Sequence, residues 1–144
     1  MNNHRYYKWS LINLAETLDV YDIASVVIDD PRFEVWSGSS KEHQHHYGKG
    51  GLLRHTYEVV ELCKASCNSL QLNIDFKELY LSALFHDCGE MWDYEPLGAN
   101  MDSWRGTEHK RLIHHISRSA LVWNNACNKN ISKCGKYIEF SIFF

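Results

Sequence analysis

The chain of 144 residues has a hydrophobic fraction of 44%, enough for the apolar core of one ordinary domain. Its 15 basic and 18 acidic side chains leave a formal charge of -3, so charge alone does not hold a long nucleic acid. No apolar run approaches the ~20 residues that span a bilayer, and the N-terminal residues lack the apolar core of a signal peptide. We therefore expect a cytoplasmic, single-domain protein without a membrane segment.

The first part of the sequence predicts two short helices. Residues 6–18 place apolar side chains at three- and four-residue steps, and residues 22–28 form a second apolar stretch that ends before Pro31. Residues 33–36 alternate weakly, as in a short extended segment, and a loop follows at residues 37–40. We expect the first helix to serve in packing.

Residues 41–51 combine histidines, glycines and lysines directly before a helix predicted at residues 52–66. Glycine lets backbone approach a ligand closely, and helix N-termini favour anions. This segment is either a phosphate-facing loop or a solvated polar loop, and composition alone favours the second. Within the helix, His55 shares a face with Val59 and Leu62, which places His55 on the buried side.

A second strong helix is predicted to begin at Asp75, with Glu78 at the position that completes a capping box. Its side chains are apolar almost all round, which indicates the most buried helix. It ends at the adjacent pair His86 and Asp87, and Gly89 is a natural helix terminator. Buried ionisable neighbours cost free energy unless a metal or partners satisfy them, so this pair marks a candidate site.

Residues 90–106 form a longer connection, too irregular for a strand and too aromatic for disorder. It is either a lid or pocket wall, or simple surface cover. Thr107 is expected to cap a third helix, and the pattern loses definition beyond Asn124. His114 and His115 bracket the core stripe of this helix, so at least one of them faces inward. The stripe is predicted at Leu112, Ile116, Ala120 and Trp123.

The cysteine count is odd and lacks the spacing of a disulfide scaffold, which predicts free thiols in a reducing compartment. Cys63 and Cys67 lie four residues apart and can both reach a metal, but two ligands do not make a zinc site. Structural thiols are therefore the favoured interpretation for Cys63, Cys67, Cys88, Cys127 and Cys134.

The three stronger helices offer His55, then the pair at residues 86 and 87, then His115. Mixed imidazole and carboxylate ligands suit first-row divalent metals, with Mn, Fe, Ni, Zn and Mg all compatible. Such a cation activates water and neutralises phosphoryl oxygens, so phosphoester hydrolysis is a natural reaction for this set.

These residues resemble the HD-domain metal-dependent phosphohydrolases. Three motifs carry the resemblance, in the family's order and spacing: residues 45–56 (HHYGKGGLLRHT), 83–90 (ALFHDCGE) and 111–117 (RLIHHIS). The likeness covers about residues 33–124 and is strongest to the HD module of bacterial 3'-to-5' exoribonucleases and to phage HD proteins. It implies an all-α helical bundle, one HD-type domain over residues 1–144, with residues 125–144 as an atypical tail.

The resemblance also implies roles for the histidines. His55, His86 and Asp87 correspond to the ligands of the main metal. His115 matches the histidine that serves a second metal or the substrate phosphate in binuclear relatives. His114 stands where relatives usually have glycine.

Further residues follow from the same resemblance. His46 and Lys49 fall in the loop that faces the scissile phosphate in relatives. Lys110 either assists there or belongs to a solvated helix turn. Glu90 replaces the lysine of many relatives, while the bacterial 5'-nucleotidase branch has a glutamate in this position that does acid–base work on bound water. A catalytic role is slightly favoured over a solvent-exposed charge, because a carboxylate three residues beyond the HD pair can reach that water.

The C-terminal part departs from the family. Full HD domains supply a further histidine pair and a final metal-ligating aspartate on later helices, whereas residues 116–144 contain neither residue type and only Glu139 as a carboxylate. We expect a truncated or frame-shifted domain whose C-terminal helices are missing or altered. Weaker metal binding and exposed apolar surface should follow, which favours a homo-oligomer or low stability.

The main functional hypothesis is a divalent-metal-dependent phosphohydrolase that hydrolyses a phosphoester of a nucleotide or short nucleic acid through metal-activated water. Asp87 and Glu90 are its candidate catalytic residues. The alternative is a catalytically inactive HD-fold binding or regulatory module, and a third hypothesis is a helical protein whose histidines only satisfy one another. The candidate substrate contacts are His46, Lys49, Lys110 and His115, and the candidate metal ligands are His55, His86, Asp87 and His115.

Overall fold

The computed structural model describes residues 3–130 and is mostly helical. Its helices are α1 (Asn3–Thr17), α2 (Tyr21–Ile28), α3 (Gly51–Leu70), α4 (Phe76–Phe85), α5 (Glu90–Asp93), α6 (Glu108–Leu112) and α7 (His114–Lys129). Two strands, β1 (Tyr94–Leu97) and β2 (Ser103–Gly106), form an antiparallel hairpin. The helical prediction is therefore confirmed, but the all-α class leaves out this small sheet.

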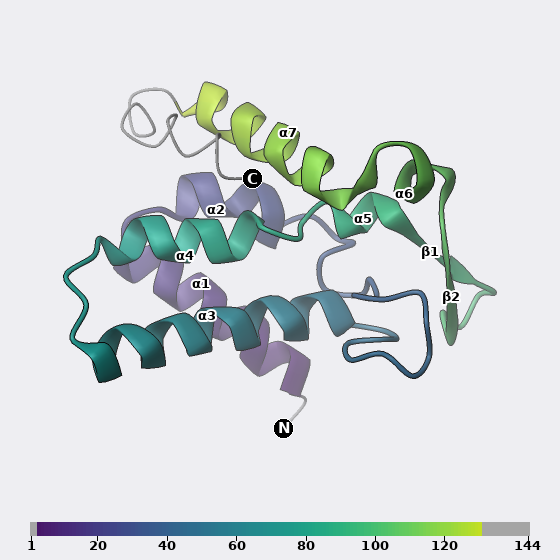
Figure 1. Ribbon diagram of the computed structural model, residues 1–144, viewed down its shortest axis with the longest axis horizontal. Coiled ribbons are helices and arrows are strands. Elements are labelled where there is room, and N and C mark those ends of the chain that lie inside the picture. Colours follow the sequence, from purple (N-terminus) through teal and green to yellow (C-terminus); the bar gives the residue numbers. More distant parts are fainter. Residues whose placement is uncertain (1–2, 131–144) are drawn as a thin grey trace.

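Helix α4 lies at the centre of the fold, as its apolar sequence predicts. It packs between α3 and α7, while α1 and α2 lie behind these three helices (Figure 1). Asp75 caps α4 by accepting the Lys77 N–H at 3.0 Å. The buried Tyr80 hydroxyl donates to the Leu11 carbonyl of α1 at 2.8 Å. Aromatic burial and edge-to-face pairing then join α4 to α7, through Phe85 and Trp123 with ring centroids 5.1 Å apart.

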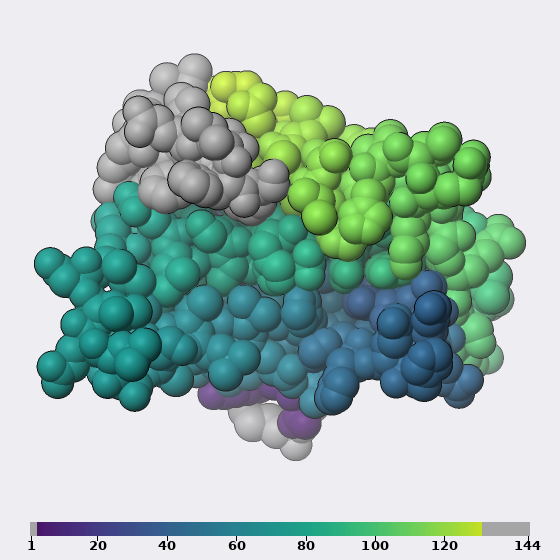
Figure 2. All heavy atoms as spheres, in the orientation of Figure 1, coloured from purple at the N-terminus to yellow at the C-terminus, as the bar shows by residue number. Residues whose placement is uncertain are grey.

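The connection after the HD pair is not the irregular segment that the sequence predicted. It begins with the single turn of α5 and continues as the β1–β2 hairpin, in which Tyr94 lies opposite Gly106 and Pro96 opposite Trp104. Two strands of four residues, one holding a proline, are too short to show a period of two. The Trp104 ring packs edge-on against Trp36 at 5.3 Å, so the hairpin lies beside the loop at residues 37–50 (Figure 2).

The third predicted helix is two helices. Thr107 caps α6 as expected, by accepting the Lys110 N–H, but His114 has a φ of +71° and separates α6 from α7. Leu112 and Ile116 lie on either side of this break and are 65% and 52% exposed instead of lying in the core, because the two helices do not share one continuous buried face. Helix α7 also continues past Asn124 to Lys129. Its buried face consists of Ser119, Trp123, Ala126 and Cys127.

Three smaller predictions need correction. Residues 33–36 form tight turns instead of an extended segment, with the Trp36 N–H donating to the Arg32 carbonyl. Leu62 is 67% exposed, so it does not share a buried face with His55. Gly89 does not terminate a helix, because α4 already ends at residue 85 and Gly89 has ordinary right-handed helical angles.

The described cysteines are free, as predicted: Cys63, Cys67, Cys88 and Cys127. Burial raises the pKa of the Cys88 thiol to about 12, so this residue is an unreactive packing group. Cys134 and Glu139 lie outside the described residues. None of the helices between residues 3 and 130 combines the length and the apolar character that a membrane crossing requires.

Candidate metal centre

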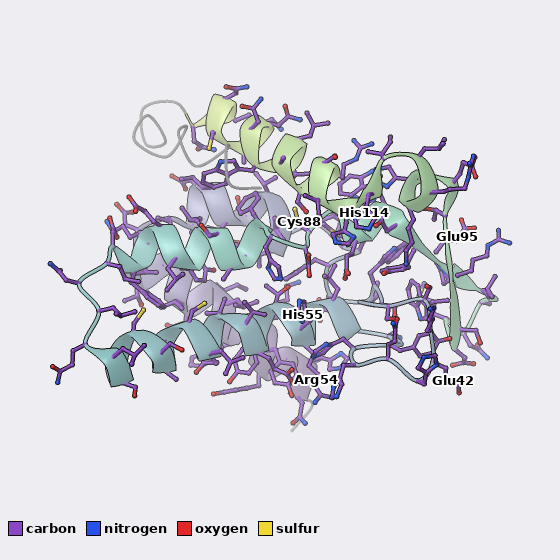
Figure 3. The ribbon with its side chains drawn as sticks, in the orientation of Figure 1. Glu42, Arg54, His55, Cys88, Glu95 and His114 are labelled. Atoms are coloured by element: carbon purple, nitrogen blue, oxygen red, sulfur yellow. The ribbon has the colours of Figure 1, made fainter. Side chains whose placement is uncertain are left out.

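Three segments that are distant in the sequence meet at one end of the bundle. His55 lies on the second turn of α3, His86 and Asp87 lie in the turn that follows α4, and His115 lies on the first turn of α7. Figure 3 shows His55 on α3 across from the segments that carry Cys88 and His114. The packing of α3 and α7 against α4 therefore brings the predicted ligands together.

The inner set consists of two imidazole nitrogens and one carboxylate oxygen. His55 Nε2 lies 3.1 Å from His86 Nε2 and 3.0 Å from Asp87 Oδ2, and His86 Nε2 lies 3.0 Å from the same oxygen. Ligands ~2.1 Å from a common ion and at right angles to one another are about 3.0 Å apart. The triangle thus has the size of one face of an octahedral coordination sphere.

The hydrogen bonds around His86 direct a lone pair into this triangle. His86 Nδ1 lies 2.7 Å from the Ala83 carbonyl, which only accepts, so Nδ1 carries a hydrogen, and in the neutral ring Nε2 is left as an acceptor. That acceptor faces the oxygen of Asp87. Two acceptors at 3.0 Å repel each other unless a proton or a cation lies between them.

The protonation of His86 and Asp87 follows from the same contact. Burial lowers the pKa of His86, but the hydrogen bond to Asp87 and the charge of that carboxylate outweigh burial and raise the pKa above its usual value. Burial alone would raise the pKa of Asp87, yet its hydrogen bonds with His55 and His86 hold this pKa well below the usual range. The site therefore keeps a carboxylate charged and attracts a positive charge to the position between these groups.

Glu90 is the buried carboxyl group of the site. It is only 6% exposed, which excludes the alternative of a solvent-exposed charge, and its Oε2 has no hydrogen-bond partner among the described residues. Burial, with the negative charges of Asp87 and Asp93, raises the pKa of Glu90 to about 9, against a smaller opposing effect of Lys110. A carboxylate oxygen of Glu90 also lies within 4.8 Å of ligand atoms of Asp87 and His115. A buried carboxyl group with an oxygen that lacks a donor suits a cation.

His115 closes the site from α7. Its Nε2 lies 3.7 Å from Asp87 Oδ1, so the two oxygens of Asp87 face different histidines. The His115 side chain is 18% exposed and contacts Asp87 and Asp93, while His114 is exposed, so the prediction that at least one of the pair faces inward is confirmed. Gly89 permits this approach of α7, because a Cβ atom there would lie 2.2 Å from the His115 carbonyl, and its N–H donates to Ser119 Oγ at 2.9 Å.

The residues predicted to meet a phosphate lie around the cluster at different distances. The His46 ring lies 4.8 Å from the His55 ring, but His46 Nε2 is paired with Glu58 at 2.7 Å, which lowers the pKa of Glu58. Lys49 is exposed, and within the described residues no hydrogen bond or ion pair joins it to the cluster. Lys110 hydrogen-bonds the Tyr94 hydroxyl at 3.0 Å, beside Glu90.

Two residues of this region, Asp93 and His109, were not singled out from the sequence. Asp93 is fully buried, and its carboxylate is hydrogen-bonded to His109 at 2.7 Å and to His115 at 2.9 Å. Their sequence separations of 16 and 22 residues cross the hairpin, so no helical or strand period connects them. The only available signal was the concentration of histidines before residue 116.

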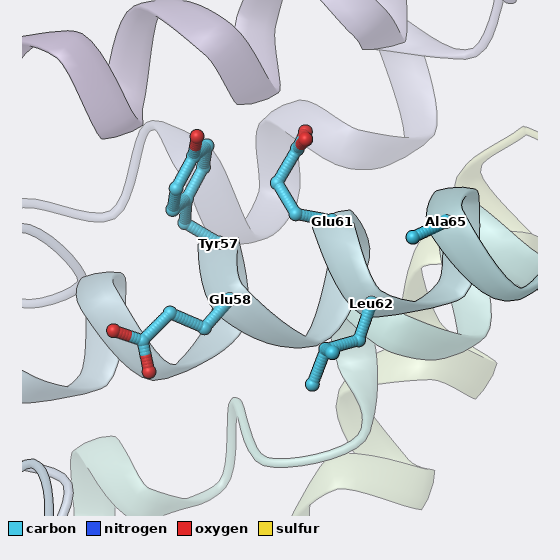
Figure 4. A pocket seen from close by; sticks show the side chains of 5 residues that line it. All are labelled: Tyr57, Glu58, Glu61, Leu62 and Ala65. Atoms are coloured by element: carbon cyan, nitrogen blue, oxygen red, sulfur yellow. The ribbon is translucent and has the colours of Figure 1, made fainter.

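A groove of about 550 Å³ runs along α3 next to the site. Figure 4 shows Tyr57 and Glu61 on one side of the helix and Glu58 and Leu62 on the other. Two carboxylates in its lining disfavour a phosphate, so we do not assign the substrate to this groove.

The chemistry of the donor set, rather than the shape of a cavity, defines the site. Two imidazole nitrogens, an ionised carboxylate and the unpaired oxygen of Glu90 lie close together, and a divalent cation fits this set of ligand atoms. No protein-family model matches this chain, and neither the curated proteins nor the solved structures contain a match to it.

Proposed function

We propose that this protein is an HD-type, divalent-metal-dependent phosphohydrolase that acts on a phosphoester of a nucleotide or short nucleic acid. The observation that carries the proposal is the triangle of His55, His86 and Asp87, whose edges are 3.0, 3.0 and 3.1 Å. The helices that supply these residues follow the order of the three HD motifs, which supports an HD-type helical bundle.

In this proposal His55, His86 and Asp87 would hold the ion, and His115 or Glu90 would supply a further ligand. When bound, a divalent cation activates water and neutralises phosphoryl oxygens. Mn, Fe, Ni, Zn and Mg all accept such a mixture of imidazole and carboxylate ligands.

The remaining residues divide the work of binding and proton transfer. Glu90 is buried beside Asp87 and is protonated near neutral pH without a metal, so it can hold and deliver a proton at the site. Lys110, His46 and Lys49 would supply positive charge or hydrogen-bond donors for phosphate oxygens around the metal ligands. The net charge of -3 favours a mononucleotide or short oligonucleotide over a long polyanion.

A second candidate is a catalytically inactive HD-fold module that binds a ligand or regulates a partner. One observation favours it: residues 103–144 contain no aspartate, the residue type that supplies the last carboxylate ligand in the HD family. Such a module would keep the cluster but bind the metal weakly or not at all.

Metal analysis with a matched control separates these two candidates. The protein is loaded with Mn, dialysed, and analysed for bound metal beside His86→Ala and beside His43→Ala, which removes an exposed loop imidazole. Release of phosphate or nucleoside is measured for the same three proteins with a panel of nucleotides and short oligonucleotides. One equivalent of metal and turnover, both lost only in His86→Ala, support the hydrolase. A folded wild-type protein without metal or turnover excludes it and supports the inactive module.

A further inference from the structure

Asp93, the last residue of α5, lies behind the candidate metal ligand His115. Its side chain is fully buried and receives three N–H donors: His109 Nδ1 at 2.7 Å on Oδ1, and the backbone N–H and Nδ1 of His115, each at 2.9 Å, on Oδ2. The Asp93 carbonyl also accepts the Thr107 N–H at 2.9 Å. This carboxylate is therefore held rigidly and holds His115 by two bonds.

The hydrogen-bond pattern determines where the hydrogens of both rings lie. Arg118 Nε is 3.0 Å from His109 Nε2, and a guanidinium only donates, so His109 carries its hydrogen on Nδ1, facing Asp93. By the same reasoning the Asp93 carboxylate selects the Nδ1–H form of His115. The other nitrogen of His115, Nε2, is then an acceptor directed at Asp87 Oδ1, 3.7 Å away.

The outer end of this chain of contacts is also fixed. The Arg118 guanidinium lies over the Trp92 ring at 5.1 Å, and Arg32 lies over the same ring at 4.1 Å. Trp92 is the neighbour of Asp93 on α5. Two guanidinium groups thus contact the residue that precedes Asp93.

An alternative role for Asp93 is direct metal ligation, because ligand atoms of Asp93, His114 and His115 lie within 4.8 Å of one another. The contacts argue against it. Both oxygens of Asp93 already accept N–H donors, and His114 is exposed. A ligating histidine whose other nitrogen donates to a carboxylate is a common way to orient a metal ligand and increase its basicity.

We propose that Asp93 is a positioning residue: its carboxylate holds His115 with Nε2 turned toward Asp87, and His109 with Arg118 holds that carboxylate in place. The metal that His115 would meet rests on the function proposed above. The orientation of the ring does not, so the two ideas can fail separately.

The first measurement uses the metal-free wild-type protein. Two-bond ¹H–¹⁵N spectra of protein labelled at its histidine nitrogens, recorded with a chelator above neutral pH, show which ring nitrogen carries the hydrogen. We expect His115 and His109 to carry it on Nδ1. A hydrogen on Nε2 of His115 overturns the proposal, whatever the protein does with metals.

The second measurement is Mn affinity by calorimetry for Asp93→Asn, His115→Ala and the double variant. An amide offers one oxygen and turns an NH₂ donor toward the other ring, so Asn cannot hold both histidines, and it removes the negative charge behind His115. We expect Asp93→Asn to weaken Mn binding roughly 10- to 100-fold. In the His115→Ala background the same change should have no further effect, because Asp93 acts through His115.

The controls keep the outcome decisive. His114→Gly removes the adjacent imidazole and should leave Mn affinity unchanged. If Asp93→Asn does not fold, His109→Asn retains a donor to Asp93 but loses Arg118, and a weaker loss of affinity is expected. Equal losses from Asp93→Asn with and without His115 would instead make Asp93 a ligand. Wild-type protein that binds no Mn contradicts the proposed function alone, and the ring spectra still decide the role of Asp93.

Discussion

Two clusters of histidine and carboxylate lie side by side and differ in how their hydrogen bonds are matched. Around Asp93 each carboxylate oxygen receives N–H donors, and His109 both donates to Asp93 and accepts from Arg118. Around Asp87 the acceptor nitrogen of His86 faces a carboxylate oxygen, and Glu90 Oε2 is buried without a donor. The residue types are the same, but one cluster is complete and the other lacks positive charge.

This difference indicates a structural role for the Asp93 cluster and agrees with the metal-binding role proposed for the Asp87 cluster. A matched buried network rigidifies its surroundings, whereas unmatched acceptors cost free energy that a cation recovers. His115 belongs to both clusters, through Nδ1 on the Asp93 side and Nε2 on the Asp87 side. Through His115, the hydrogen bonds around Asp93 fix the position of a residue that also faces Asp87.

The largest effect is expected when a divalent cation is added to the cluster around Asp87. Mn at about 1,000 times its dissociation constant should raise the free energy of unfolding by about 4 kcal/mol, because the ion binds the folded protein alone. His55→Ala should abolish this gain, since it removes one corner of the triangle, while His109→Asn should retain most of it. Urea unfolding with Mn and with a chelator measures the effect. An equal gain in wild type and His55→Ala would show that the ion binds elsewhere.

A substitution at the junction of the two clusters should damage both. Gly89→Ala would place a methyl group 2.2 Å from the His115 carbonyl oxygen, so the start of α7 must move away from the turn that holds His86 and Asp87. We expect a loss of about 3 kcal/mol in stability together with weaker Mn binding. Gly106→Ala is the control, because its Cβ would meet only the flexible Lys110 side chain at 3.3 Å. Similar losses for both alanines in urea unfolding would contradict the packing argument.

Local sequence patterns predicted the helices that deliver the inner triangle. The apolar run before His86 specified a buried helix, Asp75 specified its start, and the glycine-rich segment before His55 specified the beginning of α3. These are short-range signals, since each depends on residues within a few turns. The convergence of His55, His86, Asp87 and His115 followed from the motif order, and the structure brings these four residues together.

The same sequence patterns could not predict the cluster around Asp93. Asp93 meets His109 and His115 only because the hairpin folds back and because His114 breaks the helix, and neither event has a periodic signal. The prediction of one continuous helix also placed Leu112 of α6 and Ile116 of α7 in the core, and both are exposed. Long-range pairing decided these features, while local propensity decided the helices around them.

The unmatched cluster should also show itself in the pH dependence of metal-free stability. The pKa of Glu90 is about 9 in the folded protein, above its unfolded value, so the folded state binds one more proton between about pH 5 and 9. Stability contributed by the protonated group is therefore lost as pH rises through this window, by up to about 1.4 kcal/mol per pH unit.

Glu90→Gln removes this titration and should flatten the profile relative to wild type. In a chelator the variant is expected to gain on wild type steadily from pH 5 to pH 8, as measured by urea unfolding. Comparing the two proteins cancels the contribution of His86, whose raised pKa also costs stability as pH rises. Parallel profiles for the two proteins would mean that Glu90 is already ionised and paired in the folded state.

The smallest effect concerns the residue that separates the two helices without joining either cluster. His114 has a φ of +71°, a region that glycine enters freely and that costs other residues roughly 1 kcal/mol. His114→Gly and His114→Ala both remove the ring, so their difference isolates the backbone. We expect Gly to be more stable than Ala by about 1 kcal/mol, the reverse of their order inside a helix. Neither variant should change Mn affinity, because the ligand is the next residue; an Ala variant more stable than Gly would mean that α6 and α7 join into one continuous helix.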